Sequence, residues 1–503
     1  MRLFELLAAL PDFSTGAVRD MEISGVVSDS RRVRPGYLFV CIPGLHVDGH
    51  HYVRAAVAAG AVAVVVQKGC MSETGTQLPF IEVTSARAAL ARLVSHFCGD
   101  PGDKLKLVAV TGTNGKTSVA FMLRAIFEGA MYRCGLIGTV RCYSGDRELA
   151  GQVLSPLANM TTPDPEALYP MLAQMVKDGV QVVIMEATSH ALALDKLDAL
   201  HFDAAVFTNL TPEHLDFHGD MEHYFAAKAK LFGRSSLAIL NRDDPYAKRM
   251  AERTQGEVRF CSARSAEADY FADNACGMGV DGVGFELLSR DVRMRVRCSV
   301  PGRFSVMNAL EAAALALEWG ISPAVIQGAL SSMSGIDGRM ERIKLPLGAD
   351  FSVFVDYAHT PDAMENLLRS VREFCRKEQR IVTLFGCGGD RDASKRPVMG
   401  RIAASLSDFV IVTSDNSRTE SREAIIADIL GGMEEFENFT VILDRRHAIE
   451  TAVMRAKAGD ILLLLGKGHE TYEIDRTGRH PFVERDIVRA AYERRVAGQR
   501  ESE

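Results

Sequence analysis

The segment 108–118 has the residue types and the spacing of a phosphate-binding loop. An apolar run predicts a buried parallel strand, and it ends in a loop containing Gly112, Gly115, Lys116 and Thr117 before a helical pattern begins. Glycines let backbone N–H groups approach phosphate oxygens, the helix dipole favours negative charge, the lysine adds a positive charge, and the threonine hydroxyl can bind Mg²⁺. The spacing G-x-x-G-K-T is a shorter variant of the common loop. An ordinary strand-to-helix turn is the alternative, but these residues favour a site for a nucleoside triphosphate.

Further polar groups follow in the middle of the chain. Glu186 comes at the end of a predicted strand, where a carboxylate can complete a Mg²⁺ shell; its alternative role is a helix N-cap. His214 and His218 share a loop with acidic residues and could bind a metal, although a solvated loop is the simpler interpretation. Lys228 and Lys230 lie on the next predicted helix, and their local pattern alone indicates solvated residues.

Four loops in the last third of the chain carry charges of both signs. Each follows a predicted strand, and they are Asp356–Asp362, Gly386–Asp392, Ser414–Arg418 and Gly466–Glu470. Open α/β sheets bind ligands at the carboxyl ends of their strands. One such loop could be a turn or a helix cap. Four together predict a pocket for a zwitterionic or dicationic substrate.

The elements that must position these residues alternate between strands and helices, which predicts an α/β fold with parallel sheets. We expect three domains, 1–103, 104–336 and 337–503: an N-terminal domain, a P-loop-type ATPase domain and a Rossmann-like domain. The predicted strands are 36–42, 61–67, 80–83, 180–185, 204–208, 237–240, 351–355, 381–385, 409–413 and 461–465. The predicted helices include 52–59, 86–97, 118–127, 221–232 and 363–374.

The composition is typical of a soluble globular protein. Of 503 residues, 47% are hydrophobic and 24% are charged, and the formal net charge is −7. This balance argues against a general nucleic-acid or anionic-membrane binder, and no apolar run approaches the ~18 residues that span a bilayer. The N-terminal apolar run contains Glu5 and makes a poor signal peptide. Ten scattered cysteines without metal-ligand spacing indicate reduced thiols, so we expect a cytoplasmic protein.

Together, the motifs of this chain resemble those of the Mur ligase family. The family's marks are G-T-N-G-K-T at Gly112–Thr117, E-x-[ST]-S-H at Glu186–His190, T-N-L at Thr208–Leu210, H-L-D-x-H-G at His214–Gly219 and D-Y-A-H-T-P-D at Asp356–Asp362. Further motifs are similar to those of the family member that adds the third amino acid of the peptidoglycan peptide: H-Y-x-A-A-K at His223–Lys228, G-R-M-E at Gly338–Glu341, G-C-G-G-D-R-D at Gly386–Asp392 and G-K-G-H-E at Gly466–Glu470. The resemblance spans all three predicted domains.

The resemblance implies an ATP-dependent, amide-forming ligase of peptidoglycan synthesis. ATP would phosphorylate the D-glutamate carboxylate of UDP-MurNAc-L-Ala-D-Glu, and an amine of a diamino acid would then displace phosphate. Lys116 and two Mg²⁺ ions would neutralise the transferring phosphoryl group, with Thr117 and Glu186 holding one ion and His214 the other. The resemblance also implies that CO₂ carbamylates Lys228, which turns a cation into a metal ligand. A monomer is expected.

The resemblance assigns two further sets of binding residues. The ATP set comprises Gly112, Thr113, Asn114, Gly115, Lys116, Thr117, Ser118, Asn308, Arg339 and Asp356. The set for the UDP-sugar peptide comprises Ser28, Ser30, Leu45, His46, Val47, Thr161, Thr162, Thr188 and Lys196. Thr188 and Lys196 replace a usual Ser and Arg, and Leu194 stands where a Gln is common. The first predicted domain would bind UDP, the second ATP and the third the incoming amino acid.

The amino-acid set decides which substrate is expected. It comprises Arg391, Asp415, Asn416, Ser417, Arg418, Gly466 and Glu470. Relatives that add meso-diaminopimelate carry D-N-P-R, whose Arg binds the distal carboxylate. This chain keeps Arg418 but has Ser417 in place of the proline, which frees the φ angle and adds an N–H. A substrate without a distal carboxylate would leave Arg418 facing an unpaired site, so meso-diaminopimelate is expected. L-Lysine or L-ornithine is the alternative.

Other classes of protein stay open on the sequence alone. A folylpolyglutamate synthase-like ligase would share the phosphate loop but would need a pterin pocket and no UDP substrate. An inactive nucleotide-binding scaffold would be expected to lose at least one of the residues Lys116, Glu186, His214 and Lys228, and all are present. A P-loop mechanical or signalling ATPase would hydrolyse ATP without an amino-acid acceptor.

Overall fold

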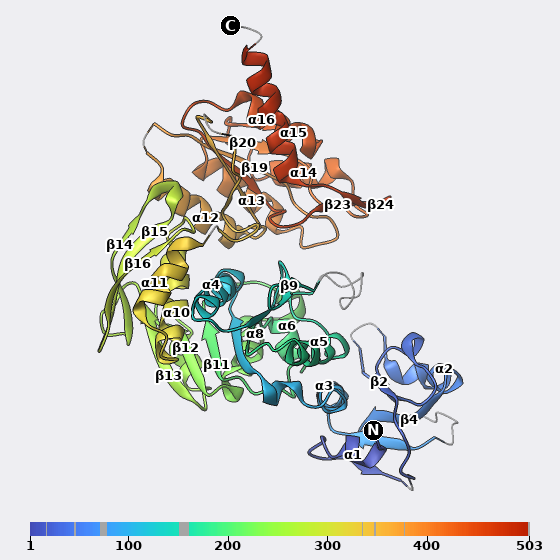
Figure 1. Cartoon of the computed structure of the whole chain (residues 1–503). Helices are drawn as coiled ribbons and strands as arrows, with labels where there is room; N and C mark the ends of the chain where they lie inside the picture. The colour runs from blue at the N-terminus through green and yellow to red at the C-terminus, as the bar shows by residue number, and fades with distance from the viewer. Residues whose placement is uncertain are drawn as a thin grey trace. The chain divides into compact units, whose positions relative to one another are not determined.

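The computed structural model describes residues 1–16, 18–44, 47–70, 78–149, 160–333, 335–346, 349–376 and 378–500. The chain forms two compact units, Met1–Phe260 and Cys261–Glu503. In Figure 1 the first runs from blue to green and the second from yellow-green to red. Both units combine sheets with helices that alternate along the chain. The predicted α/β fold with parallel sheets is therefore confirmed.

The first unit begins with a small sheet of order β1-β5-β4-β3-β2, in which every neighbouring pair except β1 and β5 is parallel. Its elements are α1 (Leu3–Leu7), β1 (Ser14–Thr15), β2 (Gly25–Val27), β3 (Tyr37–Val40), α2 (Val53–Ala58), β4 (Ala61–Gln67), β5 (Phe80–Val83) and α3 (Ala86–Phe97). β4 has a neighbour on each side and is an almost continuous apolar run, as expected of an inner parallel strand. α3 begins where the Ser85 hydroxyl accepts a hydrogen bond from the Ala88 N–H.

The second sheet of this unit carries the phosphate loop. Its strands within the unit run in the order β12-β11-β6-β10-β7-β8-β9, and those from β12 to β7 are parallel. The elements are β6 (Lys106–Thr111), α4 (Lys116–Gly129), β7 (Cys134–Ile137), β8 (Cys142–Ser144), β9 (Arg147–Glu148), α5 (Pro165–Lys177), β10 (Val182–Glu186), α6 (Ser189–Ala193), β11 (Ala204–Phe207), α7 (Leu215–His218), α8 (Met221–Ala229), β12 (Leu237–Asn241) and α9 (Ala247–Ala251). Val110 lies opposite both Glu186 and Val206, so β10, β6 and β11 end at the same edge.

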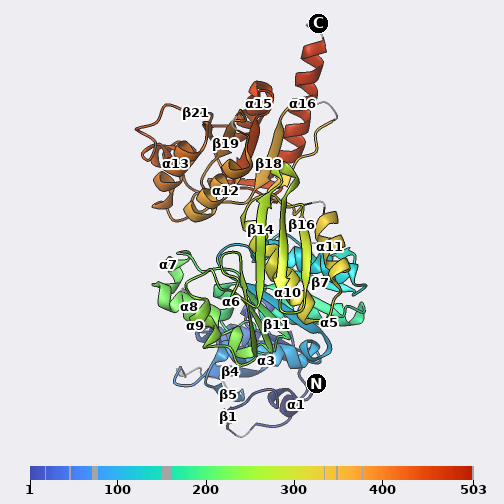
Figure 2. The ribbon, with the colours of Figure 1, turned by 90° about the vertical axis from the view of Figure 1, so that its left-hand side faces the viewer.

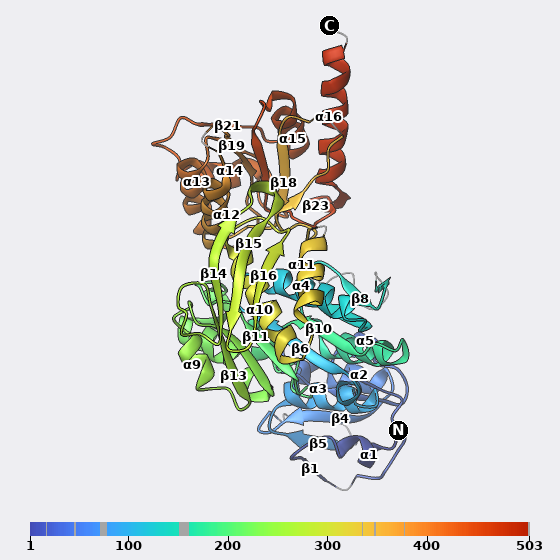
Figure 3. The ribbon, with the colours of Figure 1, turned by 60° about the vertical axis from the view of Figure 1, so that its left-hand side comes forward.

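The second unit starts with strands that pack on two helices. β13 (Glu257–Ser262) crosses the unit boundary and is followed by β14 (Tyr270–Gly277), β15 (Val283–Ser289), β16 (Arg293–Cys298), α10 (Phe304–Glu318) and α11 (Pro323–Ser332). β14, β15 and β16 are antiparallel neighbours, with α10 and α11 against them (Figure 3). Along β16 buried and exposed side chains alternate, because one face meets α11 and the other meets solvent.

The C-terminal sheet has the order β17-β18-β22-β19-β20-β21 and is parallel from β18 to β21. Its elements are β17 (Glu341–Arg342), β18 (Ser352–Asp356), α12 (Pro361–Phe374), β19 (Ile381–Phe385), α13 (Lys395–Leu406), β20 (Phe409–Val412), α14 (Arg422–Leu430), β21 (Phe439–Val441), α15 (Arg445–Arg455), β22 (Ile461–Leu465), β23 (Tyr472–Asp475), β24 (Gly478–Pro481) and α16 (Glu484–Arg500). One apolar cluster joins the sheet to α12, α13 and α14, and another joins its opposite face to α15 and α16 (Figure 2). β23 and β24 form a separate hairpin.

The predicted elements agree closely with those observed. The strands 61–67, 80–83, 381–385 and 461–465 and the helix 86–97 are confirmed at the predicted residues, and most others shift by one or two residues. The predicted helix over 221–232 ends earlier, at Ala229. All ten cysteines are free thiols. The division into domains 1–103, 104–336 and 337–503 stays a prediction. In the described part of the chain, no helix is long and apolar enough to cross a membrane.

Candidate active site

The phosphate loop lies between β6 and α4 and depends on two glycines. Gly112 has a φ of +150°, and a Cβ at this position would lie 1.9 Å from the Thr208 Oγ1. Gly115 has a φ of +88° and immediately precedes α4. The Asn209 side chain accepts a hydrogen bond of 2.9 Å from the Asn114 N–H, which ties the loop to the segment after β11. Because both glycines have a positive φ angle, a side chain at either position would strain the backbone.

Lys116 is folded against this loop. Its Nζ donates hydrogen bonds to the main-chain oxygens of Gly112, at 2.9 Å, and Thr113, at 2.8 Å. It is also the first residue of α4, so its charge adds to the positive end of the helix dipole. An anion at this helix terminus would meet both sources of positive potential, which fits the predicted phosphate site.

Glu186 ends β10 beside the loop and contacts neutral donors. The Thr117 hydroxyl lies 3.1 Å from both carboxylate oxygens, and Thr139 donates from its N–H and its hydroxyl at 3.0 Å. Glu186 is 1% exposed and forms no ion pair with the residues that the structure describes. The helix that follows is capped by Thr188, whose Oγ1 accepts from the Ala191 N–H at 3.2 Å. The alternative role of Glu186 as a helix cap is therefore wrong.

Lys228 is buried, which corrects the solvated position that its local pattern indicated. It is 1% exposed, its Nζ donates to the Gly112 main-chain oxygen at 2.8 Å, and it lies 4.7 Å from the centre of the Tyr224 ring. α8 packs against the loop because the Tyr224 and Thr113 hydroxyls are hydrogen-bonded at 3.1 Å. Burial, and the nearby charge of Lys116, hold the pKa of Lys228 well below its ordinary value. Lys230 is 47% exposed in its side chain, as expected, and pairs with Asp195.

The histidine segment packs into a cluster instead of a fully solvated loop. His214 has a φ of +56° and precedes the short helix α7. The His190 ring lies 4.7 Å from that of His214 and 5.5 Å from that of His218, whose Nε2 is 2.9 Å from the Ser189 hydroxyl. Burial and the neighbouring His214 lower the pKa of His190 to about 4, so its ring is neutral at pH 7. Among the described residues, no group of three or more His, Cys, Asp or Glu side chains is arranged to hold a metal ion.

The threonines expected to contact the sugar peptide surround Glu186. The Thr162 hydroxyl donates to the Glu186 main-chain oxygen at 2.8 Å and lies 3.2 Å from the Thr188 hydroxyl. The hydroxyls of Thr161 and Thr139 are 2.9 Å apart. Lys196, also expected there, pairs with Asp164 at 2.7 Å and is mostly buried. The structure thus brings this part of the expected set to the edge of β10.

Two of the residues expected at the UDP end, Ser28 and Ser30, lie directly after β2. The Ser28 N–H donates to the Glu166 carboxylate, and Ser30 begins a 3₁₀ turn after β2. Arg31, Arg32 and Tyr37 help to line a cavity of about 630 Å³ in this region. Ser28 and Ser30 do not line that cavity. Among the remaining expected contacts, Val47 is exposed, whereas Leu45 and His46 lie outside the described residues.

Three further residues expected at ATP lie in the second unit. Asn308 is buried on α10. Asp356, at the end of β18, accepts hydrogen bonds of 2.7 Å from the N–H groups of Met340 and Ala358. Burial raises the pKa of Asp356, and the charge of Arg339 partly offsets this rise. The Arg339 guanidinium also lies 5.0 Å from the centre of the Tyr357 ring, so Arg339 and Asp356 belong to one cluster.

The loops expected to bind the amino acid meet at the carboxyl ends of β19, β20 and β22. The Asn416 side chain donates to Glu470 at 2.8 Å, and the Arg418 guanidinium donates to the Gly389 main-chain oxygen at 2.7 Å. Gly466 has a φ of +107°, and a Cβ there would lie 2.8 Å from the Asp415 Oδ2. Ser417 is buried beside them, whereas Arg391 is exposed. Three of the four loops that the sequence predicted to form one pocket are therefore brought together here.

Sequence reasoning gave no role to three charged residues that these loops enclose. Arg445, Lys467 and Glu484 are almost completely buried. Arg445 and Lys467 contact residues at the ends of β20 and β22, and Glu484 pairs with Arg445. A lysine between two glycines directly after an apolar strand was a visible signal for Lys467. Arg445 and Glu484 each begin a helix and looked like surface residues, so no local pattern pointed to them.

Comparison with known proteins identifies the family. Family models match residues 22–98 ("Mur ligase family, catalytic domain"), 110–316 ("Mur ligase middle domain") and 338–468 ("Mur ligase, glutamate ligase domain"). The chain belongs to the Mur ligase family. A UDP-N-acetylmuramoyl-L-alanyl-D-glutamate–2,6-diaminopimelate ligase of Gloeobacter violaceus is 42% identical over 498 residues, 98% of this chain and 99% of that protein. The ligase of the same description from Syntrophomonas wolfei is 40% identical over 495 residues, 97% of this chain and 98% of that protein.

Solved structures agree with this assignment. A structure described as UDP-N-acetylmuramoyl-L-alanyl-D-glutamate–2,6-diaminopimelate ligase has a TM-score of 0.66 and 31% sequence identity, over 94% of this chain and 95% of that one. The MurF ligase of Thermotoga maritima in complex with ADP has a TM-score of 0.60 at 17% identity, over 94% of this chain and 98% of that one. The second match shows a shared fold only.

Proposed function

We propose that this chain is an ATP-dependent ligase that adds meso-diaminopimelate to the D-glutamate carboxylate of UDP-MurNAc-L-Ala-D-Glu in peptidoglycan synthesis. The observation that carries the reaction class is the joint position of Lys116, Thr117, Glu186 and Lys228 around one phosphate loop in a member of the Mur ligase family. The full-length relatives named as 2,6-diaminopimelate ligases support the choice of substrate.

The reaction requires an activated carboxylate. The γ-phosphoryl group of ATP is transferred to the side-chain carboxylate of D-glutamate, giving ADP and an acyl phosphate. The neutral amine of the incoming amino acid then attacks the acyl carbon, the bond to phosphate breaks, and the amine loses a proton as the amide forms. Lys116 and the N-terminus of α4 neutralise negative charge on the transferring group.

Magnesium fits the residues around Glu186. A buried carboxylate whose contacts are neutral donors, next to a threonine hydroxyl at 3.1 Å, offers the hard oxygen ligands that Mg²⁺ prefers. We assign one Mg²⁺ to Thr117 and Glu186 and a second to His214 and carbamylated Lys228. When bound, these ions would supply electrostatic stabilisation of the phosphoryl oxygens.

Carbamylation fits the environment of Lys228. The reaction joins a neutral amine to CO₂ and releases one proton, so it needs an uncharged lysine. Burial and the charge of Lys116 hold the pKa of Lys228 well below its ordinary value, which favours the uncharged amine that the reaction needs. The product carries a negative charge where the free amine would carry none.

The substrate contacts follow the division of the predicted domains. In this proposal, the UDP-sugar peptide contacts Ser28, Ser30, Leu45, His46, Val47, Thr161, Thr162, Thr188 and Lys196, and ATP contacts the phosphate loop with Asn308, Arg339 and Asp356. Arg418 binds the distal carboxylate of the amino acid, with Arg391, Asp415, Asn416, Ser417, Gly466 and Glu470 around it. The enzyme works as a monomer in the cytoplasm, where ATP and nucleotide-activated sugars are made.

Phosphate release tests this proposal directly. The purified chain is supplied with ATP, Mg²⁺ and UDP-MurNAc-L-Ala-D-Glu, and with meso-diaminopimelate, L-lysine or L-ornithine in separate reactions. Release that requires meso-diaminopimelate is the expected result. Preference for lysine or ornithine would keep the ligase and contradict the role of Arg418. Release that needs no amino acid or no UDP substrate would contradict the ligase itself.

A further inference from the structure

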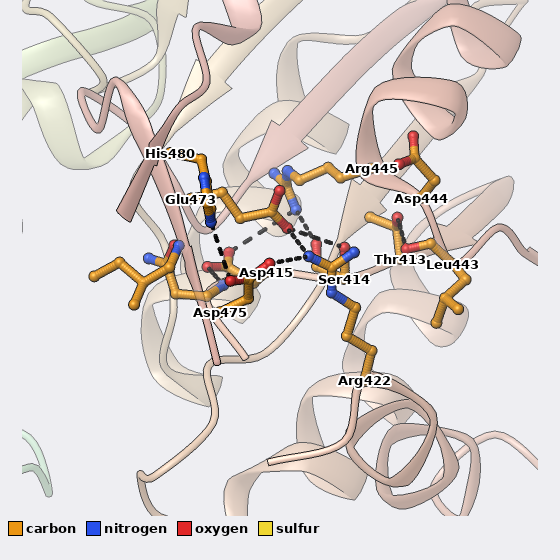
Figure 4. Close-up of polar contacts among 12 residues, drawn as sticks. Thr413, Ser414, Asp415, Arg422, Leu443, Asp444, Arg445, Glu473, Asp475 and His480 are labelled. Carbon is orange, nitrogen blue, oxygen red and sulfur yellow. Dashed lines mark hydrogen bonds and ion pairs between the residues drawn. The ribbon is translucent and has the colours of Figure 1, made fainter. Parts of the chain in front are cut away.

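Arg445 joins three separate parts of the second unit. Its guanidinium donates to the main-chain oxygens of Ser414, at 3.2 Å, and Leu465, at 2.9 Å, which follow and end β20 and β22 respectively. It also pairs with the Glu484 carboxylate at 2.8 Å and lies 3.9 Å from Asp415. Figure 4 shows this guanidinium beside Ser414 and Asp415. The side chain is 0% exposed, so its donors serve the protein and are not open to a ligand.

Lys467, directly after β22, also links separate parts of this region through buried hydrogen bonds. Its Nζ donates to the Asn416 Oδ1 and to the Tyr472 main-chain oxygen, each at 3.0 Å, and lies 3.7 Å from Asp415 and 4.0 Å from Glu470. The side chain is also 0% exposed. A fully buried ammonium is stable only when such partners surround it. Lys467 is therefore part of the framework behind the loops and does not reach the pocket surface.

The orientation of Asn416 depends directly on this lysine. Its Oδ1 accepts from Lys467 and from the Ile474 N–H at 2.9 Å, which fixes the amide so that its NH₂ group points to Glu470. Without the ammonium, the Asn416 oxygen would lose one partner, and Asp415 and Glu470 would face each other without a cation between them. The two carboxylates, Asp415 and Glu470, would then be free to reorient or to take up a proton.

We propose that Lys467, anchored by Arg445, is a positioning residue of the amino-acid site that holds Asp415, Asn416 and Glu470 in the arrangement that binds an ammonium group of the diamino acid. The inference rests on the proposed function. It adds Lys467 and Arg445, which act on the substrate only through the residues that they hold in place. Preorganisation of this kind typically contributes about 10-fold to 100-fold to binding or activity.

The test compares two cations that lie near buried carboxylates at opposite ends of β22, Lys467 being fully buried and Arg380 39% exposed. Lys467→Met removes the ammonium and keeps most of the side-chain volume. Arg380→Met is the matched control, because Arg380 pairs with the buried Asp460 at 2.6 Å just before β22, at the opposite end of that strand. For Lys467→Met we expect the KM for meso-diaminopimelate to rise about 10-fold to 100-fold while the KM for ATP stays within about twofold. Arg380→Met should lower the melting temperature without that selective change.

A pH profile provides a second readout, which a purely structural role would not move. Asp415 faces Lys467 and Glu470 from the loop after β22, Arg445 from α15 and Arg418 from its own loop. Burial raises the pKa of Asp415, but Lys467 and Arg445 outweigh this effect and hold it below its ordinary value. In Lys467→Met that pKa rises, so the acid limb of 1/KM for the amino acid should move to higher pH. In Arg380→Met it should stay in place.

The outcomes separate this inference from the proposed function. Equal changes in every KM, or an acid limb that does not move, would overturn the positioning role. Should Lys467→Met fail to fold, Arg445→Lys keeps the charge but cannot span Ser414, Leu465 and Glu484, and a normal KM for the amino acid in that variant would overturn the role equally. No phosphate release by the unmodified chain with any diamino acid would contradict the proposed function instead.

Discussion

The phosphate-loop site of the first unit and the amino-acid loops of the second are built by different means. In the first, one short segment after β6 sets the backbone, and Gly112 and Gly115 take conformations that only glycine adopts easily. In the second, the ends of β20 and β22 and the loops that follow them are joined by buried side chains, above all Arg445 and Lys467. The comparison indicates that the proposed nucleotide site depends mainly on local backbone geometry, whereas the proposed amino-acid site depends on charge pairs between distant parts of the chain.

The largest effect is expected at the phosphate loop. Lys116→Ala removes the charge that, in the proposed function, neutralises the transferring phosphoryl group, so phosphate release should fall ~10²-fold or more with every amino acid tested. Lys230→Ala, which removes an exposed lysine of the same unit, serves as the control. Near-normal turnover in Lys116→Ala would contradict its role.

A similar loss of turnover is expected when Lys228 is replaced, but in this variant an added carboxylic acid should restore part of the activity. Lys228→Ala removes the proposed metal ligand and should lower turnover about 10²-fold. Added acetate or another short carboxylic acid should restore part of the activity, because its carboxylate can occupy the space of the carbamate. Rescue should fail in Lys116→Ala. Full activity of Lys228→Ala without any added acid would exclude the carbamate.

A smaller effect, selective for one substrate, is expected at Arg418 in the proposed amino-acid site. Arg418→Ala removes a charged hydrogen-bond donor, so the KM for meso-diaminopimelate should rise about 10-fold or more, with little change in the KM for ATP. Steady-state kinetics with L-lysine as a second acceptor provide the comparison. An equal effect on both amino acids would show that Arg418 does not read the distal carboxylate.

The smallest effect is expected from a single methyl group. Gly466→Ala and Gly459→Ala both place a side chain at a positive φ, +107° and +84°, and each should lower the unfolding free energy by about 1–2 kcal/mol. Only at Gly466 would the new Cβ lie 2.8 Å from Asp415, whereas at Gly459 its nearest neighbour is 3.7 Å away. A raised KM for the amino acid in Gly466→Ala alone is therefore expected. Equal KM values for the amino acid in the two variants would show that the approach of the new Cβ to Asp415 does not affect substrate binding.

The sequence predicted the fold and the strand–loop–helix arrangement around Gly112 and Gly115 well because their signals are local. Apolar runs identified the inner strands, and the spacing of Gly112, Gly115 and Lys116 identified the loop. Lys228 needed tertiary information, since its burial comes from the contact between α8 and a loop more than a hundred residues earlier. Arg445 and Glu484 could not be predicted, because helix starts are ordinarily solvated and only the folded sheet brings the two residues together.

The hairpin of β23 and β24 has a consequence for engineering. Its residue Ile474 donates its N–H to the Asn416 side chain and accepts the Arg418 N–H, so one main-chain position aligns both residues. A salt-bridge cluster of Arg422 with Glu473 and Asp475 secures the same hairpin (Figure 4). Libraries that vary the hairpin sequence would thus alter the alignment of Asn416 and Arg418 without changing any side chain of the proposed amino-acid site.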